Sequence, residues 1–126
     1  MASDNEHCGD RGRECTITVS NPVLRGMYPD PSWIWDTTRE EIVLVNSSFE
    51  LVPGLPIHTT RDLVTWTRTA NAVDETMSHR LLIDGVEDSG GLYAPTIRRI
   101  GGRYVIVCTV ARVDEVKALA AGCSQK

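Results

Sequence analysis

The sequence predicts an all-β fold. Short runs rich in β-branched and aromatic residues recur over residues 32–69, and a second set begins near residue 92. Turn residues separate the runs at intervals of about ten residues. This spacing is typical of a β-sandwich, a β-barrel or a β-propeller, and the pattern alone leaves these three architectures open.

The first set contains four expected strands, which together predict one antiparallel sheet over residues 32–69. Trp33 and Trp35 stand two positions apart in the first strand, so they point to the same face. Trp66 is expected in the core of the sheet. A tight loop, "LVPGLP", is expected between the second and third strands because it holds two prolines and a glycine. The four runs are "SWIWD" (32–36), "EIVLVNSSF" (41–49), "IHTT" (57–60) and "VTWTR" (64–68).

The second set predicts a β-hairpin. The runs "LYAPTIRRI" (92–100) and "RYVIVCTVA" (103–111) flank Gly101-Gly102, a pair that supplies the positive φ angles of a hairpin turn. Residues 71–91, which separate the two sets, are polar and read as irregular. The two sets together define a domain over residues 20–111.

The two ends of the chain differ from this β-rich domain. Residues 1–19 are polar and charged, and we expect them to form a disordered leader. In residues 112–126, Val113, Val116 and Leu119 recur at helical spacing, which predicts a short C-terminal helix.

Composition excludes several classes of function. The chain has 126 residues, the size of one small domain, and 13 basic against 17 acidic residues give a formal net charge of −4. No basic tract interleaves with aromatic residues, so no nucleic-acid partner is expected. No apolar run is long enough to span a bilayer, so no membrane partner is expected. The N-terminus as written lacks the apolar region of a secretory signal, which predicts a cytoplasmic protein unless the true start lies upstream. The oligomeric state is left open.

The cysteines predict neither a metal site nor a cofactor. Cys8, Cys15, Cys108 and Cys123 have a spacing that matches no zinc-binding pattern. His7 beside Cys8 and Cys15 offers three potential ligands, but a polar tail explains these residues better. Free thiols are therefore expected.

The stretch "MYPDPSWIW" (27–35) holds one carboxylate, Asp30, between Pro29 and Pro31. A residue before proline is pushed out of the helical region, so we expect Asp30 to be extended and the backbone to be stiff. A stiff backbone aims a side chain well, which suits catalysis. The alternative is an ordinary turn leading into a strand, because Asp, Pro and Ser are common turn residues.

Three motifs in order resemble one enzyme family. "NPVLRGMYPDPSWIW", "SSFELVPGLPIHTTRDLVTW" and "SGGLYAPTIRRIGGRYVIV" are similar to the N-terminal part of glycoside hydrolase family 43, the β-xylosidase and α-L-arabinofuranosidase group, over about residues 20–110. The resemblance implies a five-bladed β-propeller with four-stranded blades and a central active-site pocket. It also implies hydrolysis of glycosidic bonds with inversion, in carbohydrate metabolism such as xylan degradation.

The resemblance also implies roles for three residues. Asp30 occupies the position of the general base, and Phe49 and Tyr93 occupy positions that line the sugar subsite. The family more often has tryptophan at the position of Tyr93. An ordinary core role for both aromatic residues is the alternative. The implied substrate is a xylo-oligosaccharide or an arabinose-substituted saccharide, and the sequence does not separate the two.

The chain is short for this fold. Propeller blades take about 40–50 residues each, so about two blades are expected here. The acid and the auxiliary aspartate of the family cannot be mapped onto this sequence, which predicts a truncated and inactive glycosidase. A non-catalytic fragment for carbohydrate binding or assembly is the alternative.

The sequence thus predicts that the 126-residue chain alone does not hydrolyse aryl β-xyloside or aryl α-arabinofuranoside. The base activates water only while the glycosidic oxygen is being protonated, and general acid catalysis contributes about 10²–10⁴-fold. The measurement is release of the aryl group by the purified chain beside its Asp30→Ala variant. Turnover that disappears in the variant would contradict the prediction.

Overall fold

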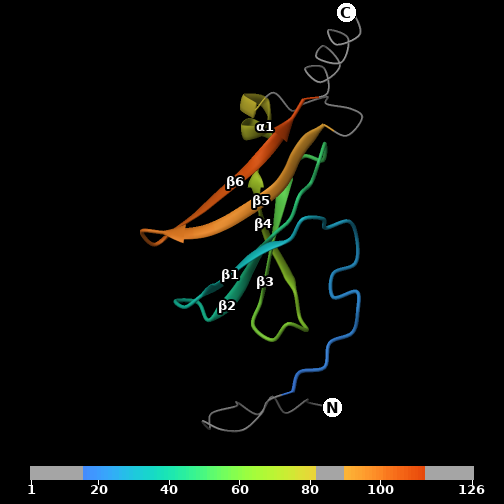
Figure 1. Cartoon of the computed structure of the whole chain (residues 1–126), viewed down its shortest axis with the longest axis vertical. Coiled ribbons are helices and arrows are strands. Elements are labelled where there is room, and N and C mark those ends of the chain that lie inside the picture. The colour runs from blue at the N-terminus through green and yellow to red at the C-terminus, as the bar shows by residue number, and fades with distance from the viewer. Residues whose placement is uncertain (1–15, 82–89, 113–126) are drawn as a thin grey trace, which may run out of the picture.

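The computed structural model describes residues 16–81 and 90–112 and confirms the all-β class (Figure 1). Within these ranges six strands form two sheets, and one short helix follows the first sheet. The first sheet has the order β1-β2-β3-β4, and the second is the hairpin β5-β6. The elements are β1 (Ser32–Asp36), β2 (Glu41–Val45), β3 (Gly54–Thr60), β4 (Thr67–Val73), α1 (Glu75–Leu81), β5 (Gly91–Ile100) and β6 (Arg103–Ala111).

The four-stranded sheet is an antiparallel meander, as the sequence predicts, but two strand boundaries differ from the expectation. β2 ends at Val45 instead of Phe49, because the polar residues 46–48 leave the strand and bond elsewhere. β3 begins at Gly54, inside the segment expected to be a loop, because Gly54 pairs with Val73 across the sheet. Local turn chemistry was therefore overruled by pairing with a distant strand.

Alternation along β1 separates an exposed face from a packed one. Trp33 and Trp35 share one face, as expected, and are 60% and 49% exposed. Trp66 was expected in the sheet core, and this expectation is wrong. It precedes β4, is only half-buried, and donates its indole N–H to the Leu63 carbonyl at 3.0 Å.

The hairpin β5-β6 also matches the sequence. Gly101 and Gly102 form its turn with φ of 56° and 77°, values that only glycine adopts freely. The register pairs Ile100 with Arg103 at the turn, and it shifts between Tyr93 and Thr96. This irregularity lies in the part of β5 that approaches the first sheet. A bulge at such a position changes the direction in which side chains point.

Residues 71–91 were expected to be irregular, and the structure corrects this over residues 71–81 and at Gly91, while residues 82–89 lie outside the described ranges. β4 runs to Val73, and α1 follows directly. Asp74 caps the helix, because its Oδ1 accepts from the Met77 N–H at 2.8 Å and its carbonyl accepts from the Ser78 N–H at 2.9 Å. Among the described residues, no helix has the length and apolarity needed to cross a membrane.

The core lies between the two sheets. The hairpin lies across the four-stranded sheet, and β5 is the strand that contacts it most (Figure 1). A hydroxyl also bonds the two layers, because Ser32 Oγ accepts from the Ile97 N–H at 3.2 Å. The buried apolar cluster consists of Val43, Val45, Leu55, Val73, Leu92 and Ile97.

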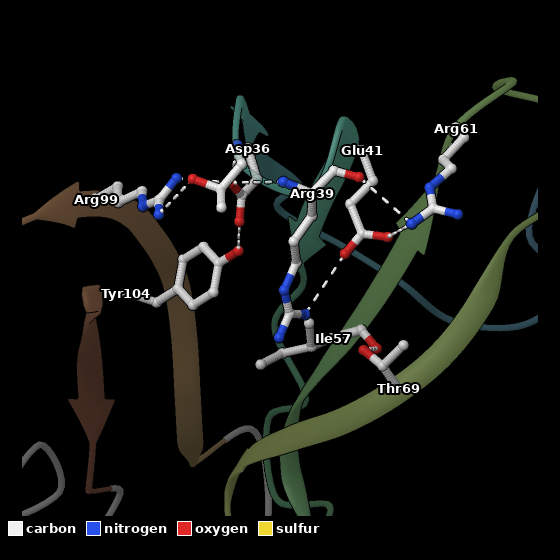
Figure 2. A network of polar contacts seen from close by, with 9 residues as sticks. Asp36, Arg39, Glu41, Ile57, Arg61, Thr69, Arg99 and Tyr104 are labelled. Carbon is white, nitrogen blue, oxygen red and sulfur yellow. Dashed lines mark hydrogen bonds and ion pairs between the residues drawn. The ribbon is translucent and has the colours of Figure 1, made fainter. Parts of the chain in front are cut away.

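A buried carboxylate joins β1 to both strands of the hairpin. Asp36, only 2% exposed, accepts from Arg99 Nη1 at 2.6 Å, from the Tyr104 hydroxyl and from the Thr38 N–H at 2.8 Å (Figure 2). The Tyr104 hydrogen bond is the main cause that holds the pKa of Asp36 below its ordinary value, against the opposing effect of burial. These partners satisfy the hydrogen-bonding capacity of the buried carboxylate. Because Arg99 and Tyr104 belong to the hairpin, the carboxylate also holds the two sheets together.

A second group of charges in Figure 2 is more exposed. Glu41 pairs with Arg39 at 3.5 Å and with Arg61 at 3.8 Å, and both guanidinium groups are largely in solvent. Exposed ion pairs of this kind contribute little to stability. Of the two charge groups in Figure 2, the Asp36 cluster is therefore the one that contributes to sheet packing.

Two expectations concern the chain ends. The expected helix over 112–121 lies outside the described residues except for residue 112, and so does the leader up to residue 15. Residues 16–19, the described end of the leader, are exposed and form neither helix nor strand.

Tyr104→Phe is expected to destabilise the protein at neutral pH, and the effect should become progressively smaller as pH falls below about 4, the ordinary range of an aspartate. The lowered folded-state pKa of Asp36 stabilises the protein above the unfolded-state value, and this contribution is lost as pH falls through the folded-state pKa. Denaturant unfolding at pH 7 and pH 3 measures the difference.

The same substitution in an Asp36→Asn background is the control for that experiment. Its effect on the free energy of unfolding should then be independent of pH. An equal effect of Tyr104→Phe at both pH values in the native background would contradict the assigned cause.

Candidate functional site

The candidate site is built around a buried polar corner, which we define as residues 46–48. This corner follows the apolar strand β2 directly. Asn46 and Ser47 are each 1% exposed, and Ser48 is also buried. Buried polar groups require hydrogen-bond partners, so the corner determines which other segments lie against it.

The corner first holds the chain that precedes β1. Asn46 Nδ2 donates to the Tyr28 carbonyl at 2.8 Å and to the Pro29 carbonyl at 3.3 Å. The Ser47 backbone N–H also donates to the Pro29 carbonyl, at 3.0 Å. Two successive carbonyls are thereby bound, which fixes the backbone just before Asp30.

Asp30 is held through its side chain as well. Ser47 Oγ donates to Asp30 Oδ2 at 2.6 Å, while the residue as a whole remains exposed. The expectation of an extended Asp30 is wrong, because its φ is 50°. Hydrogen bonds at the Pro29 carbonyl and at Oδ2 outweigh the local preference, and aspartate is among the residues that best tolerate the left-handed region.

The same hydroxyl reaches the second sheet. The Ala94 N–H donates to Ser47 Oγ at 2.8 Å, a contact between residues 47 positions apart. Ala94 also has a positive φ of 44°. Ala94 thus contacts the residue that holds Asp30.

The structure brings Phe49 and Tyr93 together. Phe49 and Leu92 exchange backbone hydrogen bonds of 3.1 and 2.9 Å, which place the next residue, Tyr93, beside Phe49. The two rings stack with centroids 4.4 Å apart and an interplanar angle of 29°. Both side chains are half-buried, so they form an aromatic pair at the surface of the same corner that holds Asp30.

Glycine is required where these two segments meet. A Cβ atom at Gly91 would lie 1.9 Å from the Phe49 carbonyl oxygen, and Gly91 has a φ of 103°. No other residue can bring β5 this close to Phe49 without moving backbone. Gly91 therefore determines the approach that stacks Phe49 on Tyr93.

Unusual backbone conformations gather at the site. Asp30, Phe49 and Ala94 all have φ between 44° and 53°, although none is glycine. Such conformations cost about 1–3 kcal/mol each and cluster at functional sites. Among the described residues, Glu40, Leu55 and Leu63 also have positive φ, so three of the six such non-glycine residues lie around Ser47.

A buried histidine contacts the segment that precedes Asp30. The His58 ring meets the Tyr28 ring edge-on, with centroids 4.7 Å apart. Burial, with a smaller effect of the Arg68 charge, lowers the pKa of His58, so its imidazole is neutral near pH 7. Its Nδ1 has no hydrogen-bond partner among the described residues.

Sequence reasoning predicts Asp30, Phe49 and Tyr93 as site residues, which stays a prediction, and it does not single out Asn46 or Ser47. The available signal was the polar run that directly follows the most apolar strand. Within the described ranges no three His, Cys, Asp or Glu residues are grouped as metal ligands, and His7, Cys8 and Cys15 lie outside those ranges.

The chain matches one family model, that of the "Glycosyl hydrolases family 43", over residues 19–122. The matched range extends beyond residues 20–110, over which the motifs show the resemblance. It includes Asp30, Phe49, Tyr93 and the polar corner.

Curated relatives carry two kinds of enzyme name. The chain is 38% identical over 93 residues to a non-reducing end α-L-arabinofuranosidase of Bacteroides ovatus, covering 73% of this chain and 17% of the relative. It is 34% identical over 97 residues to a β-xylosidase of Bacillus subtilis, covering 77% and 17%. The chain thus spans about a sixth of the length of these relatives.

Solved structures agree with the fold. A xylan β-1,4-xylosidase from Bacillus halodurans matches with a TM-score of 0.64 at 30% identity, covering 74% of this chain and 17% of that one. A family 43 protein of Bacillus licheniformis matches with a TM-score of 0.62 at 35% identity, covering 70% and 16%. The two sheets therefore correspond to part of a family 43 propeller.

Gly91→Ala is expected to cost about 1–3 kcal/mol more in free energy of unfolding than Gly101→Ala. Only at Gly91 would the added Cβ atom overlap the backbone of another segment, at Phe49. Both glycines have positive φ, but a Cβ at Gly101 meets nothing within 4 Å. Denaturant unfolding of both variants measures the difference. Equal costs would show that β5 can move away from Phe49 freely.

Proposed function

The chain belongs to glycosyl hydrolase family 43, and from this premise we propose that it contributes the catalytic base and part of the sugar pocket of a glycosidase. The bond cleaved is a β-xylosidic or an α-L-arabinofuranosidic bond, because the relatives carry both names. The reaction class is hydrolysis with inversion at the anomeric carbon.

One observation carries the proposal: the exposed carboxylate of Asp30 is fixed by a buried hydroxyl beside a stacked aromatic pair. An inverting glycosidase needs a carboxylate that removes a proton from water on one face of the sugar. Asp30 fits this task because one of its oxygens is anchored while the residue stays open to solvent.

The aromatic pair fits the apolar surface of a pentose. Phe49 and Tyr93 contact each other and keep part of their surface exposed, so a sugar ring can pack its C–H groups against them. We propose that this pair orients the sugar whose anomeric carbon is attacked by the water that Asp30 activates. Orientation of this kind is a large part of enzymatic rate enhancement.

The general acid must lie on the opposite side of the scissile bond. In inverting enzymes about 6.5–9.5 Å separates the two carboxyl groups, which leaves room for the water. We propose that the acid comes from the part of the family fold that this chain does not span, since the chain covers about a sixth of its relatives. Asp30 alone then supplies only half of the proton transfers.

Co-expression tests the proposal. The full chain is produced together with a Bacillus subtilis β-xylosidase from which the segment aligned with this chain is deleted. The pair is expected to hydrolyse aryl β-xyloside or aryl α-arabinofuranoside, with inverted product seen by NMR. Asp30→Ala should lower kcat by at least about 10²–10⁴-fold, the usual contribution of general base catalysis.

Glu50→Gln is the matched control, because Glu50 is an exposed carboxylate next to Phe49. Its kcat should stay close to that of the native pair. Turnover that survives Asp30→Ala would overturn the assignment of the base. A pair that co-purifies and binds xylose units without turnover would instead support a non-catalytic carbohydrate-binding role.

A further inference from the structure

We propose that Ser47 is a positioning residue, whose hydroxyl determines which oxygen of Asp30 faces the substrate. The inference rests on the proposed role of Asp30 as the base. Ser47 forms no recognisable motif by itself, and it is almost completely buried. Ser47 acts through Asp30 and touches no reacting atom.

The direction of each hydrogen bond is fixed by chemistry. A backbone N–H can only donate, so Ser47 Oγ accepts from Ala94. A serine hydroxyl has one proton, and it is therefore free to donate to Asp30 Oδ2. With its oxygen accepting from Ala94, the Ser47 hydroxyl uses its only proton to donate to the carboxylate.

This donation divides the two carboxylate oxygens. Oδ2 accepts the Ser47 proton, with 2.6 Å between Oγ and Oδ2, the short distance expected for a hydroxyl that donates to a charged acceptor. Oδ1 remains for a water molecule, because Asp30 is otherwise exposed. Rotation of the carboxylate would break the bond to Ser47, so the reactive oxygen stays aimed.

Ser47 also sets the carboxylate relative to the aromatic pair. Its backbone N–H holds Pro29, its hydroxyl holds Asp30, and its hydroxyl oxygen binds Ala94, the neighbour of Tyr93. Ser47 therefore contacts both the base and the second sheet, and it fixes their positions relative to each other. A displacement of β5 would therefore also displace Asp30, because this hydroxyl bonds both.

Nuclear magnetic resonance of the full chain tests the relay. Asp30→Asn is expected to shift the amide proton resonance of Ala94, because the Ser47 hydroxyl bonds both residues. Asparagine keeps an acceptor oxygen, so the shift reports the exchange of the carboxylate for an amide. The same substitution should leave the resonance in place in a Ser47→Ala background and should shift it again in a Ser47→Thr background.

Ser48→Ala is the matched control, because Ser48 is also buried and its Oγ accepts from the Leu55 N–H at 3.0 Å without contacting Asp30. It should leave the Ala94 shift unchanged. If Ser47→Ala does not fold, the comparison of native chain, Asp30→Asn and Ser47→Thr still decides. An Ala94 amide resonance that Asp30→Asn leaves in place in the otherwise native chain would overturn the proposal.

Kinetics of the co-expressed pair provide the second readout. Ser47→Ala should lower kcat by about 10–100-fold, because a misplacement of about 1 Å between reacting groups can cost about 10²-fold, with KM nearly unchanged and with rescue by Ser47→Thr. An unchanged kcat in Ser47→Ala, with activity lost in Asp30→Ala, would overturn only this inference. Activity that persists in Asp30→Ala would instead overturn the proposed function.

Discussion

The need to satisfy three buried polar residues governs how this chain is arranged. Residues 46–48 follow β2 into the interior, where water cannot serve as their partner. Their partners come from residues 28–30 on one side, from residues 92–94 on the other, and from residues 55–56 of β3. Two segments that are distant in sequence are thereby brought to one place, and the candidate site is the surface of that place.

Apolar packing and polar contacts have separate tasks in this architecture. The apolar cluster between the sheets supplies non-directional attraction and tolerates small displacements. The hydrogen bonds of Asp36 at one end of β1 and of Ser47 beyond the end of β2 are directional, and they set how the hairpin sits on the sheet. A site that needs sub-ångström placement depends on the second kind of contact.

Sequence patterns predicted most strands and the hairpin because alternation and a Gly-Gly turn are local signals. The helix α1 also had a local signal, Asp74 at its N-cap, which was overlooked because the surrounding residues are polar. The conformation of Asp30 had no local signal. It depends on a hydrogen bond from Ser47, 17 positions away, which competes with the preference of a residue before proline.

The exposed face of β1 gives the chain an intrinsic optical probe. The chain has three tryptophans, and two of them, Trp33 and Trp35, stand side by side on that face in solvent. Indole emission shifts to shorter wavelength when water is removed from the ring. Fluorescence of the unlabelled protein therefore reports whether another surface covers β1, with the half-buried Trp66 as a constant background.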